Sequence, residues 1–292
     1  MSSVGTATTV IAALWLLAAS AWAESSSELR TRLAGIAGHV TPSPTVTIAA
    51  GWFLMGSTRV DDDPYGLRTQ YDDTELPQHK VWLDAYEIDR DEVSLGEYLA
   101  FLRRDRRSVS DELQRLIWHM ITVHAATDDG LARWPALYVT WIEAADFCHA
   151  AGKRLPTEAE WEKAARGTKG NLFPWGAQAP SAELAMFGQY HMHEIPLVQP
   201  VGSGEEGKSP YGVRHMAGNV AEWVQDWFGF DYYSVTPDRN PAGPANSRYK
   251  GARGGSWKSR PMMLRTATRS GAPPDQRSPT IGFRCAKSVP KR

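Results

Sequence analysis

Three things are scarce in this sequence of 292 residues: cysteine, net charge and long-range repetition. The formal net charge is -1, so nothing in the overall balance indicates nucleic acid or an acidic membrane as a partner. No segment repeats with a period of about 20 to 50 residues, which excludes the solenoid and propeller architectures. The remaining composition, 42% apolar and 22% charged, is typical of a soluble globular chain.

Basic residues are missing from the N-terminus. Residues 1–23 contain no Lys or Arg and carry an apolar stretch, 10–19, that is too short to span a bilayer comfortably. Because Ala21-Trp22-Ala23 matches a cleavage site, we predict that 1–23 is a secretory signal peptide. The protein is then periplasmic or secreted, with no membrane partner after cleavage. The uncharged start leaves an uncleaved anchor as the alternative.

Local patterns predict one α+β domain. Residues 24–45 are polar and contain the segment TPSPT, which predicts a linker ahead of a domain over 46–288. Three capping boxes predict helix starts: Ser94 with Glu97, Thr140 with Glu143, and Thr157 with Glu160. Gly152 and Gly167 offer ends for the second and third helices. Strand patterns occur at VTIAAGWFLMGS, KVWLDAYEID and TIGFRCAK, and the region after residue 167 is rich in Gly, Pro, Trp and Asn, which predicts little regular structure there.

The two cysteines are Cys148 and Cys285. In an exported chain an isolated pair is usually joined in the oxidising compartment. The alternative is two buried free thiols.

Acidic residues are absent from 239–274, a segment with eight Lys or Arg. Within it, RGGSWKSRPMMLRTATRSG combines a Gly-Gly-Ser turn with planar guanidinium groups that suit carboxylate or phosphate. We therefore expect a pocket for an anionic small molecule or peptide, lined by Ser256, Trp257, Lys258, Arg260, Arg265 and Arg269. The alternative is that these arginines form ion pairs with Asp226, Asp231 or Glu222. No base is visible for Ser256, so no hydrolase is inferred there.

Seven blocks together resemble the formylglycine-generating enzyme (sulfatase-modifying factor) family: GWFLMGS, ELPQHKVWLDAYEIDRDEVSLGEY, AGKRLPTEAEWEKAARG, FPWG, YGVRHMAGNVAEWVQDW, RGGSW and IGFRC. They follow the family order and cover about residues 46–287. The resemblance implies a C-type-lectin-like fold with sparse secondary structure. It also implies a bridge between Cys148 and Cys285.

The copper chemistry of that family is not expected here. In its copper-dependent members, two cysteines just after the Gly-Gly-Ser turn bind Cu(I), which prefers soft thiolates. The matching stretch, 257–263, has no thiol. The resemblance therefore implies a member without Cu(I) by the cysteine route, similar to the periplasmic pyoverdine-maturation branch. Met262 and Met263 would face opposite sides of an extended segment and are interpreted as core or pocket lining.

Two other metal sites are considered. The resemblance places calcium on His215, the carbonyls of Gly218 and Val220, and Glu222, although nitrogen is a poor calcium ligand; the alternative is a metal-free loop held by Glu222. His191 and His193 would share one face of a strand and are the candidates for a transition metal. The alternative is a chance pair, and no redox metal is identified.

Two functions remain open. In the first, the chain is an exported maturation or accessory enzyme that acts oxidatively on a small molecule or protein. In the second, it is a non-catalytic C-type-lectin-like module that binds an anionic ligand or a protein partner. We favour the first, because a signal peptide precedes a single freestanding domain, while the missing thiols favour the second.

Overall fold

The computed structural model describes residues 26–40, 42–58, 73–190 and 195–290. The predicted signal peptide lies outside these residues. The prediction of a linker over 24–45 is wrong for residues 26–36, which form a helix whose Ile36 is fully buried. Among the described residues, no helix combines the length and apolarity needed to span a bilayer.

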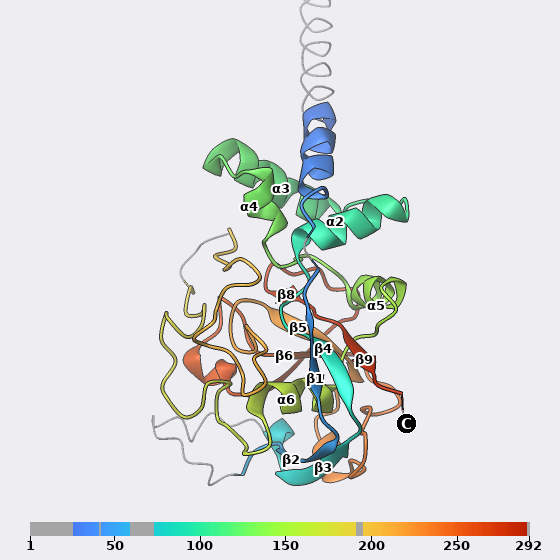
Figure 1. The fold of residues 1–292 in the computed structure, drawn as a ribbon, viewed down its shortest axis with the longest axis vertical. Helices are drawn as coiled ribbons and strands as arrows, with labels where there is room; N and C mark the ends of the chain where they lie inside the picture. Colours follow the sequence, from blue (N-terminus) through green and yellow to red (C-terminus); the bar gives the residue numbers. More distant parts are fainter. Residues whose placement is uncertain (1–25, 41, 59–72, 191–194, 291–292) are drawn as a thin grey trace, which may run out of the picture.

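A group of helices forms one end of the molecule (Figure 1). The helix over 26–36 lies there with α2 (Leu95–Arg104), α3 (Asp111–His124) and α4 (Asp128–Ala132). The capping box at the start of α2 is confirmed. The sequence did not indicate α3 and α4, because their N-cap residues Ser110 and Thr127 have no acid three residues later.

The other end of the molecule is built from three small sheets (Figure 1). Their strand orders are β1-β4-β9, β2-β3 and β7-β6-β5-β8, antiparallel except for the parallel pair β5 and β8. The segment KVWLDAYEID, expected to be one strand, forms two strands that join different sheets. The bounds are β1 Thr45–Ile48, β2 Gly51–Met55, β3 His79–Leu83, β4 Tyr86–Asp89, β5 Ala221–Trp227, β6 Lys250–Arg253, β7 Arg269–Ala272, β8 Ile281–Gly282 and β9 Ala286–Ser288.

Two further helices pack against these sheets, α5 (Trp141–Ala150) and α6 (Glu158–Arg166), and both begin with the predicted capping box. After α6 the described chain contains only short strands and the 3-10 turns η3 (Tyr232–Ser234) and η4 (Pro261–Leu264), beside η2 (Asp73–Glu75) earlier in the sequence. The expected α+β domain with a sparsely ordered second half is therefore confirmed.

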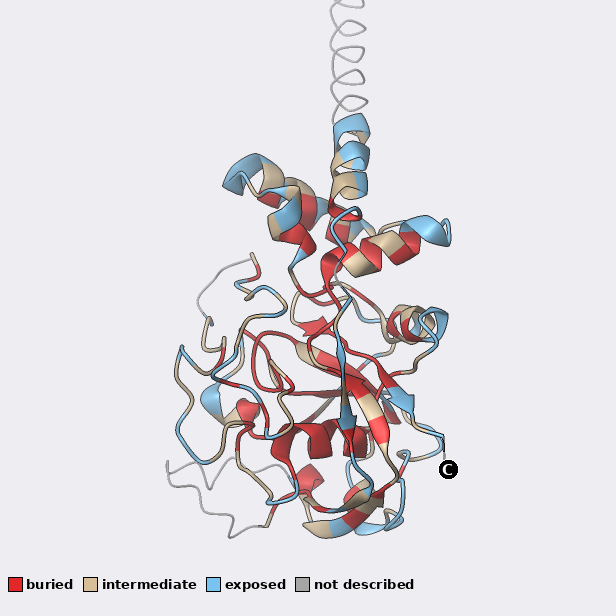
Figure 2. Ribbon diagram, in the orientation of Figure 1, coloured by how far each residue is buried: buried red, intermediate tan, exposed pale blue. Residues whose placement is uncertain are grey.

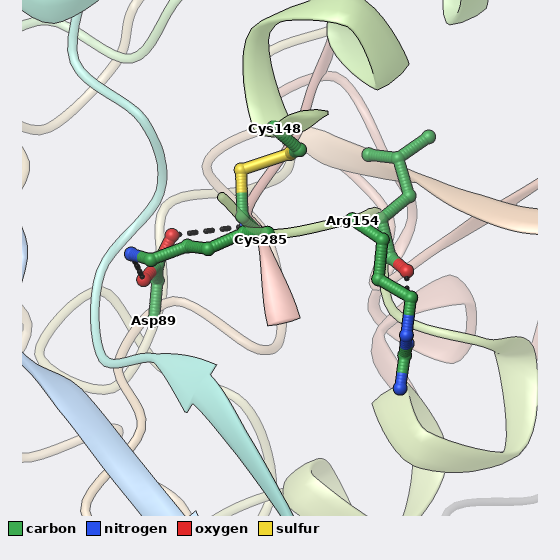
Figure 3. Close-up of a disulfide and its surroundings, with 6 residues drawn as sticks. Asp89, Cys148, Arg154 and Cys285 are labelled. Atoms are coloured by element: carbon green, nitrogen blue, oxygen red, sulfur yellow. Dashed lines mark hydrogen bonds and ion pairs between the residues drawn. A yellow bond between two sulfur atoms is a disulfide. The ribbon is translucent and has the colours of Figure 1, made fainter. Parts of the chain in front are cut away.

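A disulfide joins α5 to the C-terminal strand region (Figure 3). Cys148 and Cys285 are buried, and their sulfur atoms are 2.00 Å apart. The backbone N–H of Cys285 donates to Asp89 at 3.0 Å, and Lys153 donates to the same carboxylate at 2.5 Å. The bridge is thus set in a hydrogen-bonded corner that also includes the end of β4.

The segment TIGFRCAK is more deeply buried than a half-exposed strand. Ile281, Phe283 and Cys285 are buried as expected, but Arg284 on the opposite side is also fully buried. The segment TIGFRCAK is divided between β8 and β9, and both of its faces contact protein. A guanidinium group in such a place requires a carboxylate partner, because an unpaired buried charge is very costly.

Candidate functional site

Helix α6 is buried on every side, although its sequence, EAEWEKAAR, is mostly polar (Figure 2). Each charged side chain has a partner. Glu160 receives two hydrogen bonds of 2.6 Å from Arg154, and Lys163 donates to the carbonyls of Ala49 and Gly51. Burial lowers the pKa of Lys163 to about 8.

Glu162 is the centre of this network. Its carboxylate accepts from Arg166 at 2.8 Å, from Arg253 at 2.5 Å, from the Tyr233 hydroxyl at 3.1 Å and from the backbone N–H of Gly56 at 2.7 Å. Four donors around one buried carboxylate fix α6 against strands β2 and β6. The charged side chains of α6 therefore fix the position of the chain segments that pack around this helix.

Two of the predicted ligand-binding arginines belong to the same interior. Arg269 makes hydrogen bonds of 2.7 and 2.8 Å to Glu158, and Arg265 makes two of 2.7 Å to Glu75. Burial would lower the pKa of Arg269, but Glu158 raises it above its usual value. The expectation of two open forks is corrected: both already bind protein carboxylates, and these are not the partners Asp226, Asp231 and Glu222 weighed from the sequence.

The other predicted pocket residues do not converge on one cavity. Ser256 and Trp257 are buried, and the indole N–H of Trp257 donates to the Pro279 carbonyl at 2.9 Å. Lys258 and Arg260 are exposed, and Lys258 lies 4.9 Å from the centre of the Trp257 ring. The two adjacent methionines lie within η4 rather than in an extended segment and are half-buried.

Two cavities have volumes of about 480 and 520 Å³. The one of 520 Å³ adjoins the end of α6. Of the six predicted residues, Arg265 lines it. Arg166 and Lys169 add two more cations, and none of the lining residues that the structure describes is Asp or Glu. We call this the Lys169 cavity; its lining residues are Leu54, Ser57, Gln78, Arg166, Lys169, Gly170, Asn171, Leu172, Gly176, Ala177, Arg265, Thr266 and Ala267.

Charge in the Lys169 cavity is distributed unevenly. Arg166 and Arg265 are buried and paired with Glu162, which Arg166 shares with Arg253, and with Glu75, whereas Lys169 is exposed and has no ion-pair partner within the described ranges. Lys169 was not a sequence candidate, because it follows α6 in the loop GTKGN, which carries no recognisable motif. Arg265, the one positive residue of segment 253–271 that lines the cavity among the described residues, contributes an already paired guanidinium group.

The loop expected to bind calcium has different partners. His215 Nδ1 lies 2.8 Å from Glu92, and both oxygens of Glu222 receive hydrogen bonds of 2.7 Å from Arg284. The Trp161 indole also donates to Glu222 at 2.8 Å. The carboxylate that would bind calcium is therefore already neutralised, and this donor set does not fit the ion.

No set of three or more His, Cys, Asp or Glu side chains could hold a metal ion in the part of the chain that the structure describes. His191 and His193 lie outside the described residues. A Cu(I) thiolate site also does not fit, because segment 257–263 has no thiol and the two cysteine sulfurs are bonded to each other.

The sheets, the buried α6 and the disulfide belong to one class of protein, a mixed α/β domain with a formylglycine-generating-enzyme-like fold. The chain belongs to the family described as Sulfatase-modifying factor enzyme 1-like domain, which matches residues 34–289. The match begins inside the helix over 26–36, which agrees with the burial of Ile36 in the domain core.

Similar proteins have different names. A serine/threonine-protein kinase pkn1 of Chlamydia pneumoniae is 34% identical over 85% of this chain and 39% of its own length, so the chain spans about two fifths of that relative. A formylglycine-generating enzyme of Mus musculus is 31% identical, over 82% of this chain and 74% of the enzyme. The structure of PvdO from Pseudomonas aeruginosa is 25% identical, with a TM-score of 0.67, and 86% of this chain covers all of that one.

Proposed function

We propose that this chain is an exported, copper-independent maturation protein that holds an anionic small molecule or peptide in the Lys169 cavity and takes part in its oxidation. One observation carries the binding step: among the described residues, the lining contains three cationic side chains and no carboxylate. A volume of 520 Å³ is within the range of small-ligand sites. Membership of the family supports a role in maturation, and the similarity to PvdO extends over the whole of that chain.

The cavity would divide recognition between fixed and adaptable groups. Glu75 and Glu162 hold Arg265 and Arg166 in place, so these two guanidinium groups form a rigid, positively charged part of the wall. Lys169 is exposed and can move its ammonium group to the ligand charge. Ser57, Asn171 and other neutral polar lining residues would complete the hydrogen bonding.

Binding is tested by calorimetry with citrate and with a tetraglutamate peptide. Lys169→Met is expected to weaken binding at least tenfold without changing the thermal midpoint, because the side chain is exposed. Lys258→Met is the matched control, since Lys258 is also exposed but does not line the cavity. The site would be rejected if neither probe binds, or if Lys169→Met and Lys258→Met lose the same affinity.

Export and oxidation need separate measurements. N-terminal sequencing of protein recovered from the periplasm should start at Glu24. Metal analysis followed by oxygen uptake with the bound ligand then separates an oxidative role from the second candidate, a non-catalytic binding module. That candidate is favoured by the bonded cysteines. Binding without oxygen consumption in the metal-loaded protein would establish it.

A further inference from the structure

A serine, a histidine and a glutamate are connected by two contacts outside the Lys169 cavity, and the histidine belongs to the loop that was expected to bind calcium. His215 Nδ1 is 2.8 Å from Glu92 Oε2, and His215 Nε2 is 3.5 Å from the hydroxyl oxygen of Ser203. We propose that Ser203 is a nucleophile activated by His215 and oriented by Glu92, able to attack a carboxylic ester. This proposal does not depend on the proposed function above.

The glutamate fixes the tautomer of the imidazole. Glu92 is fully buried, and its carboxylate also accepts from the side-chain amide of Asn219 at 3.0 Å, which holds it in one orientation. A carboxylate at Nδ1 requires the N–H on that nitrogen. The lone pair of the neutral ring is then on Nε2, facing Ser203. Glu92 is a positioning residue in this arrangement.

The backbone is shaped to bring the ring and the hydroxyl together. His215 has a φ of 55°, a left-handed conformation that is uncommon for a residue with a side chain. Gly204, directly after Ser203, has a φ of 72°, and a Cβ built there would overlap Nε2 of the imidazole. Glycine at 204 therefore leaves the space through which the ring reaches the serine.

Ser203 is accessible for reaction. Its hydroxyl donates to the Pro200 carbonyl at 2.6 Å in a solvent-exposed turn, so a rotation about one bond would redirect it to Nε2. A separation of 3.5 Å is common for such pairs before a substrate binds. The cavity of 480 Å³ is adjacent, because Glu92, Val201 and Gly202 belong to its lining.

The chemistry balances without a cofactor. The Ser203 oxygen bonds to the ester carbonyl carbon while its proton passes to Nε2. The carbon–oxygen bond to the leaving group breaks, and the same proton goes to the departing alcohol. Water then attacks the acyl-serine, with Nε2 taking its proton and returning it to Ser203. The products are one carboxylic acid and one alcohol.

The test uses a fluorophosphonate reagent. An activated serine of the protein attacks its phosphorus, displaces fluoride and forms a stable oxygen–phosphorus bond. Ser234 is a matched internal control: its hydroxyl donates to the Asp231 carbonyl three residues earlier at 2.7 Å, in an exposed turn like that of Ser203. In the wild-type protein we expect an adduct on Ser203, mapped by tandem mass spectrometry, and at least a hundredfold slower reaction at Ser234.

Variants separate activation from folding. Ser203→Ala should abolish both labelling and p-nitrophenyl acetate hydrolysis, whereas Ser234→Ala should change neither. Glu92→Gln should slow labelling at least tenfold and Glu92→Asp should retain most of the rate, a distinction that a purely structural carboxylate would not produce. No adduct on Ser203 in folded wild-type protein, or equal rates at Ser203 and Ser234, overturns the proposal whatever the variants do.

Discussion

Arg265 and Glu75 are 190 residues apart in the sequence and meet through two parallel hydrogen bonds of 2.7 Å, with both side chains almost completely buried. The pair connects the segment after η4 to η2, and Arg265 lines the Lys169 cavity while Glu75 lies behind it, outside the lining. It converts a guanidinium group that would otherwise attract ligands into part of the cavity wall.

Replacing Arg265 with Met is therefore expected to destabilise the fold rather than only weaken ligand binding. The change leaves the Glu75 carboxylate buried without a cation, which costs about 3 to 5 kcal/mol. Urea unfolding should show that loss, and adding Glu75→Met should recover most of it, because two apolar side chains need no charge partner. An Arg265→Met variant with an unchanged urea midpoint would mean that the guanidinium group contributes nothing to the fold.

The sequence predicted local features well and distant partners poorly. The capping box of Thr157 and Glu160 requires only four residues, and the structure contains it as expected. The burial of every side of α6 could not be predicted, because its charged residues need partners that the local sequence lacks: the compensating arginines, Arg253 and Arg269, are about a hundred residues away. A positive segment without acids was correctly noticed, but four of its eight charged side chains, those of Lys250, Arg253, Arg265 and Arg269, are buried in the interior.

The site was predictable only in part for the same reason. Arg265 was identified as a pocket residue and does line a cavity, whereas Lys169 gave no signal because no spacing rule connects a loop lysine to a segment a hundred residues later. Likewise, His215 was assigned from its position in a calcium motif. Its actual neighbour Glu92 is 123 residues away and is revealed only by the fold.

The disulfide is expected to make a large contribution to stability. It closes a loop with a sequence separation of 137 residues, for which the chain-entropy estimate is about 5 kcal/mol. The double variant Cys148→Ala with Cys285→Ala should show most of this loss in urea unfolding, and dithiothreitol should reproduce it only after the protein unfolds, because the sulfurs are buried. Two titratable thiols in denatured, unreduced protein would contradict the bridge.

Calcium removal is expected to leave the domain stable. Arg284 already neutralises Glu222 through two hydrogen bonds of 2.7 Å. Removing calcium with a chelator would therefore leave no buried carboxylate without a cation at this place. The thermal midpoint in EDTA and in millimolar calcium should agree within about 1 °C. Arg284→Met should instead lower it strongly, because a buried carboxylate loses its cation. A clear rise in the midpoint with calcium would show that the ion binds despite this pair.

Stability should fall as pH rises through the neutral range, because of Asp226. Burial, with a smaller effect from Glu158, raises the pKa of Asp226 from 3.8 to about 8. Between these values the folded state holds a proton that the unfolded state has released. The contribution is complete below pH 3.8 and is lost as pH rises through about 8, by at most about 1.4 kcal/mol per pH unit.

Asp226→Asn should remove this slope, because the amide stays neutral at every pH. Its oxygen can still accept the hydrogen bond that the backbone N–H of Glu158 donates to Asp226 at 2.9 Å in the wild-type protein. Urea unfolding at pH 5.5, 6.5 and 7.5 gives the free energies of both proteins while avoiding the range above pH 8, where Lys250, whose pKa is lowered to about 8, acts in the opposite direction. The difference between variant and wild type should grow with pH in favour of the variant. Asp146→Asn, at an exposed ion pair, is the control and should follow the wild-type slope; parallel curves for wild type and Asp226→Asn would mean that Asp226 is ionised in the fold.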